Sequence, residues 1–177
     1  MDLHYQEIKG DLIQLALENT FNVIAHGCNC YCIQGKGIAK QMKDTFQTNK
    51  YPLERIEEKG NINKLGLIDY MLYYQGDCFV QVVNAYTQYG PGPNLDYNAL
   101  RLCLRKINHI FPNHHIGLPQ IGCGIAGGIW DINEFAMQNY ASFRKAVALR
   151  QDGFKDVKTI IIEELKDCNV TVVIYDE

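Results

Sequence analysis

The chain lacks any apolar run long enough to cross a membrane. Its 177 residues are 47% hydrophobic and 21% charged, and polar residues interrupt every long apolar stretch, whereas a membrane-spanning helix needs about 20 apolar residues in succession. The first residues, MDLHYQE, have neither the basic start nor the apolar stretch of a secretory signal. We therefore expect a cytoplasmic protein, free of membranes, that forms a single domain over residues 1–177.

The chain also lacks a surplus of positive charge. Lys and Arg total 17, Asp and Glu total 20, and the formal net charge is −3. Proteins that bind long nucleic acids neutralise many phosphates with basic side chains. This composition argues against extended nucleic-acid binding, although it leaves room for a local basic patch.

A metal site is not expected either. Seven cysteines are an odd number, so they cannot all pair within one chain. Cys28, Cys30 and Cys32 alternate with other residues, but no second cysteine pair at zinc-ligand spacing follows them. Cys28 and Cys123 have no adjacent cation and no Cys-x5-Arg phosphatase loop, so we interpret both as structural thiols.

What the chain does contain is an alternation of short apolar runs with amphipathic segments, which is typical of the α/β class with a mainly parallel sheet. The expected strands cover residues 3–9, 22–26, 67–73, 79–84, 115–118 and 170–175. Apolar residues at helical spacing predict helices over 37–46, around 100–107 and over 135–149. Residues 157–167 mix a β-branched triplet with strong helix formers, and the recurrence of apolar residues every four positions favours a helix.

Two glycine-bearing loops each follow an expected strand. Residues 26–39 lead from one strand into a helix, with Gly35, Lys36 and Gly37 at its start, and residues 120–130 contain four glycines. Such loops offer backbone N–H groups to an anion. Neither matches the dinucleotide fingerprint or the Walker sequence, and each by itself could merely form a tight turn. Together they suggest a ligand with two linked phosphates.

The order of these motifs resembles the macro domain family. The resemblance rests on Gly10-Asp11-Leu12, on Cys28-Asn29-Cys30 followed by Gly35-Lys36-Gly37-Ile38-Ala39, and on the run from Leu118 to Trp130. It covers nearly the whole chain and is strongest toward the yeast-type ADP-ribose 1''-phosphate phosphatases and the neighbouring terminal ADP-ribose glycohydrolases. It implies a three-layer α/β/α fold with a mixed, mainly parallel central sheet.

The resemblance also implies a role for particular residues in binding ADP-ribose. Asp11 would accept a hydrogen bond from the adenine amino group, with Leu12 as a backbone contact, and Tyr175 would pack near the adenine. Asn29 would hold the distal ribose. The loop residues expected around the diphosphate and distal ribose are Gly35, Lys36, Gly37 and Ile38 in the first loop, and Gly122, Cys123, Gly124, Ile125, Ala126 and Gly127 in the second. Lys36 could instead simply be solvated.

Two departures from the family pattern matter. The glycohydrolases carry a lysine after the central strand and an acidic residue in the second loop, whereas the corresponding stretches of this chain are Val83-Asn84-Ala85-Tyr86-Thr87-Gln88 and Gly124-Ile125-Ala126, and neither charge is present. Residues 131–155 form an insertion, which we interpret as one helix packed on the edge of the domain, with Asp131 as its cap.

We therefore expect the chain to bind ADP-ribose and to hydrolyse the terminal phosphate of ADP-ribose 1''-phosphate, without a cofactor and as a monomer. Asn29 would position the substrate and His26 would serve as acid or base, unless His26 is merely a buried structural histidine. The alternatives are a module that binds ADP-ribose without turnover, and a hydrolase that removes ADP-ribose from protein or nucleic acid.

Overall fold

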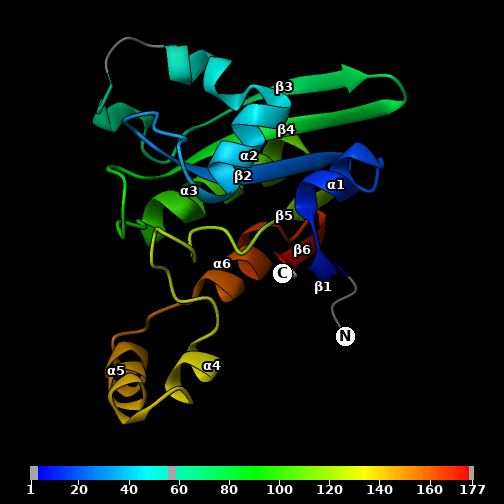
Figure 1. Ribbon diagram of the computed structural model, residues 1–177. Helices are drawn as coiled ribbons and strands as arrows, with labels where there is room; N and C mark the ends of the chain where they lie inside the picture. Colours follow the sequence, from blue (N-terminus) through cyan, green and yellow to red (C-terminus); the bar gives the residue numbers. More distant parts are fainter. Residues whose placement is uncertain (1–3, 56–58, 176–177) are drawn as a thin grey trace.

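The computed structural model describes residues 4–55 and 59–175, so Leu3, where the first expected strand was to begin, lies outside them. Its centre is a six-stranded sheet of order β1-β6-β5-β2-β4-β3 (Figure 1). The strands are β1 (Tyr5–Gly10), β2 (Val23–Asn29), β3 (Ile68–Gln75), β4 (Cys78–Gln88), β5 (His115–Leu118) and β6 (Asn169–Tyr175). All neighbours run parallel except β3 and β4. The six expected strands and the mixed, mainly parallel sheet are confirmed.

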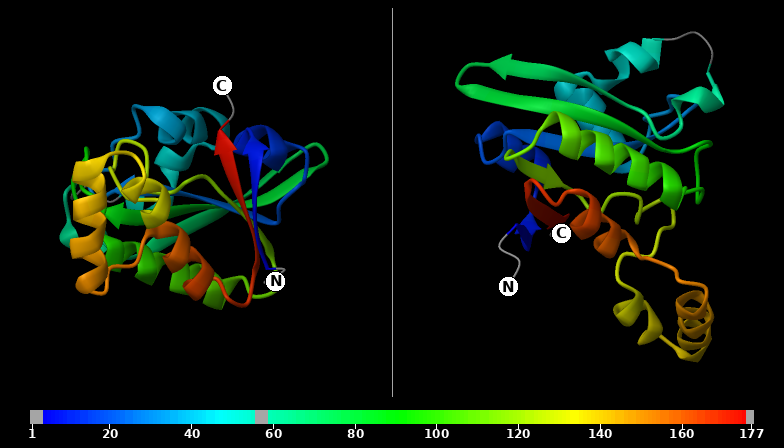
Figure 2. Two further views of the ribbon diagram at one scale, coloured as in Figure 1. Left: turned by 90° about the horizontal axis from the view of Figure 1, so that it is seen from below. Right: turned by 180° about the vertical axis from the view of Figure 1, so that it is seen from behind.

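Helices cover both faces of the sheet, which confirms the three-layer architecture (Figures 1 and 2). The helices α1 (Leu12–Leu17) and α2 (Gly37–Phe46) pack on one face, and α3 (Tyr97–Ile110) and α6 (Val157–Glu164) pack on the other. Three short 3-10 helices lie between α2 and β3 at Thr48–Lys50, Pro52–Arg55 and Ile62–Lys64. In the described part of the chain, no helix has the length and apolar character needed to cross a membrane.

The sequence explains where α3 and α6 begin. Asp96 and Asp156 cap them, each accepting a backbone N–H from the third residue that follows, at 2.9 and 2.8 Å. The ambiguous segment after Asp156 is a helix, as favoured, because Val157 and Ile161 are fully buried against the sheet face that α3 also covers. The β-branched triplet is therefore tolerated within a short helix, which ends at Glu164.

The single helix expected over 135–149 is wrong. The insertion forms two helices, α4 (Ile132–Ala136) and α5 (Tyr140–Gln151). Asn139 lies between them in an extended conformation, and its side chain accepts the Ser142 N–H at 2.8 Å, so it starts a new helix. Asp131 caps α4, as expected.

The two helices also do not pack on the domain edge. They project from the rest of the molecule as a small lobe (Figures 1 and 2), and Ala146 is the buried residue within them. The base of this lobe is fixed, because Asp156 accepts the Ile132 N–H at 2.8 Å and the Lys158 N–H bonds to the Trp130 carbonyl at 3.1 Å.

Gly117 allows β5 to pack against Phe21. A Cβ placed on Gly117 would lie 2.6 Å from Phe21 Cδ2, and the Phe21 ring is buried. We therefore expect Gly117→Ala to lower the free energy of unfolding by about 1–3 kcal/mol, measured by urea denaturation. The control is Gly124→Ala, because a Cβ there meets nothing within 4 Å. Equal stability of Gly117→Ala and the native chain would contradict this packing.

Candidate functional site

The parallel strands bring the expected ligand residues to one edge of the sheet. The segments after β1, β2 and β5 all begin at the carboxyl ends of their strands, where ligands bind in open α/β sheets. Because the order is β1-β6-β5-β2, residues from the two ends of the chain become neighbours, and Gly10 pairs with Tyr175.

At the β1 end of this edge stand Asp11, Leu12 and Tyr175. Asp11 caps α1, with its Oδ1 accepting the Gln14 N–H at 3.0 Å, and remains exposed. Its second carboxylate oxygen is therefore open to a ligand. The Leu12 side chain is buried in the core, which leaves only its backbone for the role expected of it. Tyr175 is 62% exposed, so its ring is available for packing.

The first loop is shaped by Asn29 at the end of β2. The Asn29 Oδ1 accepts the N–H groups of Tyr31 and Ile33 at 3.1 and 3.2 Å, and its Nδ2 donates to the Ile33 carbonyl at 3.0 Å. The side chain is 8% exposed. In this structure Asn29 therefore folds the loop, and only its second amide hydrogen is uncommitted.

The first loop leads into the N-terminus of α2. No side chain caps this helix at Lys36, and Gly35, Lys36 and Gly37 are exposed, with Ile38 half-buried. Among the described residues, none accepts a hydrogen bond from the N–H groups of Gly37 and Ile38. The first turn of α2 thus presents uncommitted donors and the positive end of the helix dipole.

The second loop owes its shape to glycines packed on Leu95. Gly122 and Gly127 have φ of +74° and +76°, and a Cβ on Gly128 would meet Leu95 Cδ2 at 2.4 Å. The exposed crest is Gly124 and Ile125, followed by the half-buried Ala126. Within the described structure, no acceptor bonds to the N–H groups of these three residues.

The two loops meet across the sheet edge. A Cβ placed on Gly37 would lie 3.8 Å from Ile125 Cδ1, so the uncommitted donors of α2 and of the second loop flank the same space. Cys123 contributes no reactive thiolate there, because burial raises the pKa of its thiol to about 12. Cys28 is likewise a buried thiol whose pKa is raised by burial.

His26 does not reach this space. It is fully buried, and its Nε2 lies 2.7 Å from Asn84 Oδ1. Because Asn84 Nδ2 donates to the Thr48 carbonyl at 3.0 Å, its oxygen must be the acceptor and His26 Nε2 carries the proton. Burial lowers the His26 pKa to about 4, so the ring is neutral at pH 7. This position is that of a structural histidine and does not support the expected acid or base role.

The stretch from Val83 to Gln88, where the resemblance to the glycohydrolases would place a lysine, contains none and ends in Gln88. The Gln88 Nε2 donates to the carbonyls of Gly90 and Gly92 at 2.7 and 3.1 Å, and the side chain is 9% exposed. The amide therefore holds the turn after β4, and it presents no amine to a ligand.

A buried polar cluster beneath the first loop was not anticipated from the sequence. The Tyr86 hydroxyl lies 3.0 Å from Glu54 Oε1 and 3.2 Å from Asp69 Oδ2, and burial raises the Asp69 pKa to about 6. The buried Lys64 donates to Cys32 Sγ at 3.3 Å. No local sequence signal marks this cluster, because its members come from the first loop, two of the 3-10 helices, β3 and β4.

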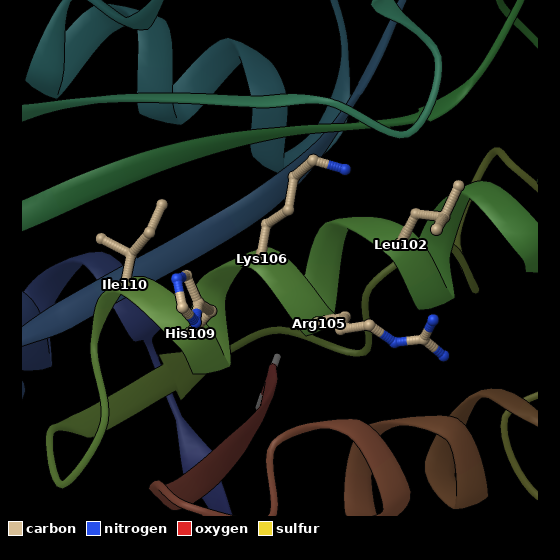
Figure 3. Close-up of a pocket in the computed structure, with 5 residues that line it drawn as sticks. All are labelled: Leu102, Arg105, Lys106, His109 and Ile110. Atoms are coloured by element: carbon tan, nitrogen blue, oxygen red, sulfur yellow. The ribbon is translucent and has the colours of Figure 1, made fainter.

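Other kinds of site find no support in the described residues. They contain no group of three or more His, Cys, Asp or Glu side chains that could hold a metal ion. A hollow of about 360 Å³ lies on the outer surface of α3, lined by Leu102, Arg105, Lys106, His109 and Ile110 (Figure 3). It involves neither glycine loop.

Comparisons with known structures bear on the fold. The chain resembles the macrodomain of Thermus aquaticus DarG, with a TM-score of 0.59, 19% identity and 98% of each chain covered. It is similar to Thermosipho africanus DarTG in complex with ADP-ribose, with a TM-score of 0.59 and 15% identity over 97% of this chain and 41% of that one. A Bacteroides thetaiotaomicron protein gives a TM-score of 0.63 at 24% identity, covering 98% of this chain and 99% of that one.

The fold is therefore that of a macro domain. No protein-family model matches the sequence. A phage relative is much closer in sequence: the uncharacterized 17.5 kDa protein of the tk-vs intergenic region of Enterobacteria phage T4 is 37% identical over 143 residues, which cover 76% of this chain and 88% of the phage protein. The chain belongs to the family of this phage protein.

The buried His26 makes a testable contribution to stability. An unfolded chain takes up a proton at His26 near pH 6.5, whereas the folded protein resists protonation until about pH 4. Folding is therefore destabilised as the pH falls through this window, by up to about 3 kcal/mol. Asp69 acts in the opposite direction, because its folded-state pKa is raised, so the test must isolate His26.

We expect the native chain to lose stability relative to His26→Gln as the pH is lowered from 6.5 to 4, because only the native chain has the His26 proton to take up on unfolding. Chemical denaturation across this range measures the difference. A difference that does not vary with pH would show that His26 titrates normally in the folded protein.

Proposed function

We propose that the chain binds ADP-ribose along the carboxyl edge of the sheet. Adenine lies at the β1 end beside Asp11 and Tyr175, the diphosphate lies between the two glycine loops, and the distal ribose lies toward Asn29. The backbone of the second loop, from Gly122 to Gly127, closes over the diphosphate and distal ribose.

The observation that carries this proposal is the convergence of the two loops. The N–H groups of Gly37, Ile38, Gly124 and Ile125 have no acceptor among the described residues, and Gly37 lies opposite Ile125. Backbone donors and a helix N-terminus bind phosphate oxygens without a side-chain cation. A chain of net charge −3 can therefore hold a diphosphate.

The β1 end supports a purine with an exocyclic amino group. Asp11 has a free carboxylate oxygen as acceptor, while Tyr175, its neighbour across the β1 and β6 pairing, offers an exposed ring. The fold likeness to Thermosipho africanus DarTG, which was solved with ADP-ribose, is consistent with this ligand.

A second candidate function is hydrolysis of the terminal phosphate of ADP-ribose 1''-phosphate, as in the yeast-type macro domains. The observation that favours it over glycohydrolase chemistry is that the stretch from Val83 to Gln88 contains no lysine, and that the Gln88 amide at its end is bound to two carbonyls. Removal of ADP-ribose from protein or nucleic acid by the glycohydrolase mechanism needs the amine of that lysine, and this chain does not supply one there. Asn29 and the loop donors would orient the substrate, since His26 is buried.

Asp11 allows the binding proposal to be tested without disturbing the fold. Asp11→Asn keeps an oxygen to cap α1 but removes the charge, so we expect unchanged unfolding and an ADP-ribose dissociation constant raised by about 10-fold or more, measured by titration calorimetry. The purine analogue, which has a hydrogen atom in place of the adenine amino group, should bind both proteins equally. A native chain that does not bind ADP-ribose would overturn the proposal, and an equal loss for both ligands would reject the adenine assignment.

The phosphatase candidate is tested by phosphate release from ADP-ribose 1''-phosphate. We expect release by the native chain and a loss of at least about 10-fold with Gly124→Val, which places a branched side chain over the exposed crest of the second loop. His26→Gln should retain the activity, because His26 does not reach the edge. Tight binding of ADP-ribose without release of phosphate would reject the phosphatase candidate and support a binding module.

A further inference from the structure

The two outer strands of the sheet are protected to very different degrees. Strand β1 carries Glu7 and Lys9, and charged residues on an edge strand discourage pairing with another chain. Strand β3 is eight residues long, and from Tyr70 to Gln75 it contains no charge, proline or glycine. Strand β1 is therefore charged along its length, whereas β3 carries no charge from Tyr70 to Gln75, and the charges near it, on Lys50 and Arg55, belong to residues that line a hollow beside Met71, Leu72 and Tyr73.

Exposed apolar side chains lie on both faces of β3. Tyr70, Leu72 and Tyr74 share one face of the sheet, because every second side chain of a strand points the same way. Their side chains are 40%, 43% and 71% exposed, and Met71 on the opposite face is 42% exposed. Phe79 of β4 is 57% exposed and lies against Tyr74 with ring centroids 5.9 Å apart. A patch of this kind marks an interaction surface.

The backbone of β3 is a regular template. It pairs with β4 without a bulge, from Ile68 opposite Ala85 to Gln75 opposite Cys78. Every second residue of an edge strand points its N–H and C=O groups away from the sheet, and in the described structure nothing bonds to these groups in residues 68–75.

We propose that two copies of this chain form a twofold dimer by antiparallel pairing of β3 with β3, which joins their sheets into one. A twofold axis through the middle of the strand, at Met71 or Leu72, places like faces together. The apolar residues of each face then meet the apolar residues of the same face in the second copy. The strand is thus complementary to itself.

The apolar surface continues from β3 onto α3. The Tyr70 ring packs on Phe111 with centroids 5.2 Å apart, and Leu102 and Ile110 are 43% and 40% exposed. Both project from α3 beside the hollow on its outer surface (Figure 3). A second copy paired at β3 would cover part of this surface. The proposal departs from the monomer expected from the sequence, and it does not involve the ADP-ribose edge.

The dimer is tested by measuring the mass of the full chain with size-exclusion chromatography and light scattering across a wide range of concentrations. We expect a concentration-dependent dimer, and Leu72→Lys should raise its dissociation constant at least about 10-fold, because it brings like charges together near the axis. A mixture of Leu72→Lys and Leu72→Glu should recover a mixed dimer. The matched control is Phe143→Lys on α5, where the native side chain is 50% exposed and the dimer should be unaffected.

Thermal unfolding and ADP-ribose titration confirm that each variant is folded, and Tyr74→Lys replaces Leu72→Lys if the latter does not fold. A native chain that remains monomeric throughout would overturn the proposal. So would a dimer that Phe143→Lys weakens as much as Leu72→Lys does, or a charge-swapped mixture that does not associate.

Discussion

The burial of β2 on both faces is the constraint from which the rest of the site follows. Val23, Ile24 and Ala25 have no exposed surface, because helices cover both faces of the sheet at its centre. Burying a polar group is costly unless it is bonded, and the His26 Nε2 pairs with Asn84 Oδ1 on β4, whereas its Nδ1 is buried without a hydrogen-bond partner among the described residues. At the end of the same strand, Asn29 bonds the loop that leads to α2. The position of the first loop is thus set by the hydrogen bonds of Asn29 at the end of this buried strand.

The site that results is made of backbone more than of side chains. Glycines let the second loop pack on Leu95, and the loop then presents its N–H groups beside the first turn of α2. The side chains that could have supplied chemistry are occupied: His26 and Gln88 are buried and bonded. Backbone N–H groups at a helix N-terminus and in a glycine loop are donors suited to an anion such as a phosphate.

Sequence patterns predicted the strands, α3, α6 and both glycine loops, because each depends on local periodicity or on a capping residue. They failed over residues 131–155, where apolar residues suggested one packed helix. Asn139 breaks that helix, and Met137, Tyr140 and Phe143 remain exposed. Helix α1 was also missed, although Asp11 caps it, since its six residues are too few for a clear period.

The sequence by itself determined the fold class, the two glycine loops and the candidate residues at the carboxyl ends of the strands, because these follow from residue type and spacing. Only the tertiary structure decided that Asp11 and Tyr175 adjoin, that Gly37 faces Ile125, and that His26 is enclosed. Each of these depends on which strands become neighbours, and strand order is set by the packing of distant segments. The same order left β3 at an edge of the sheet, a property that no local pattern shows.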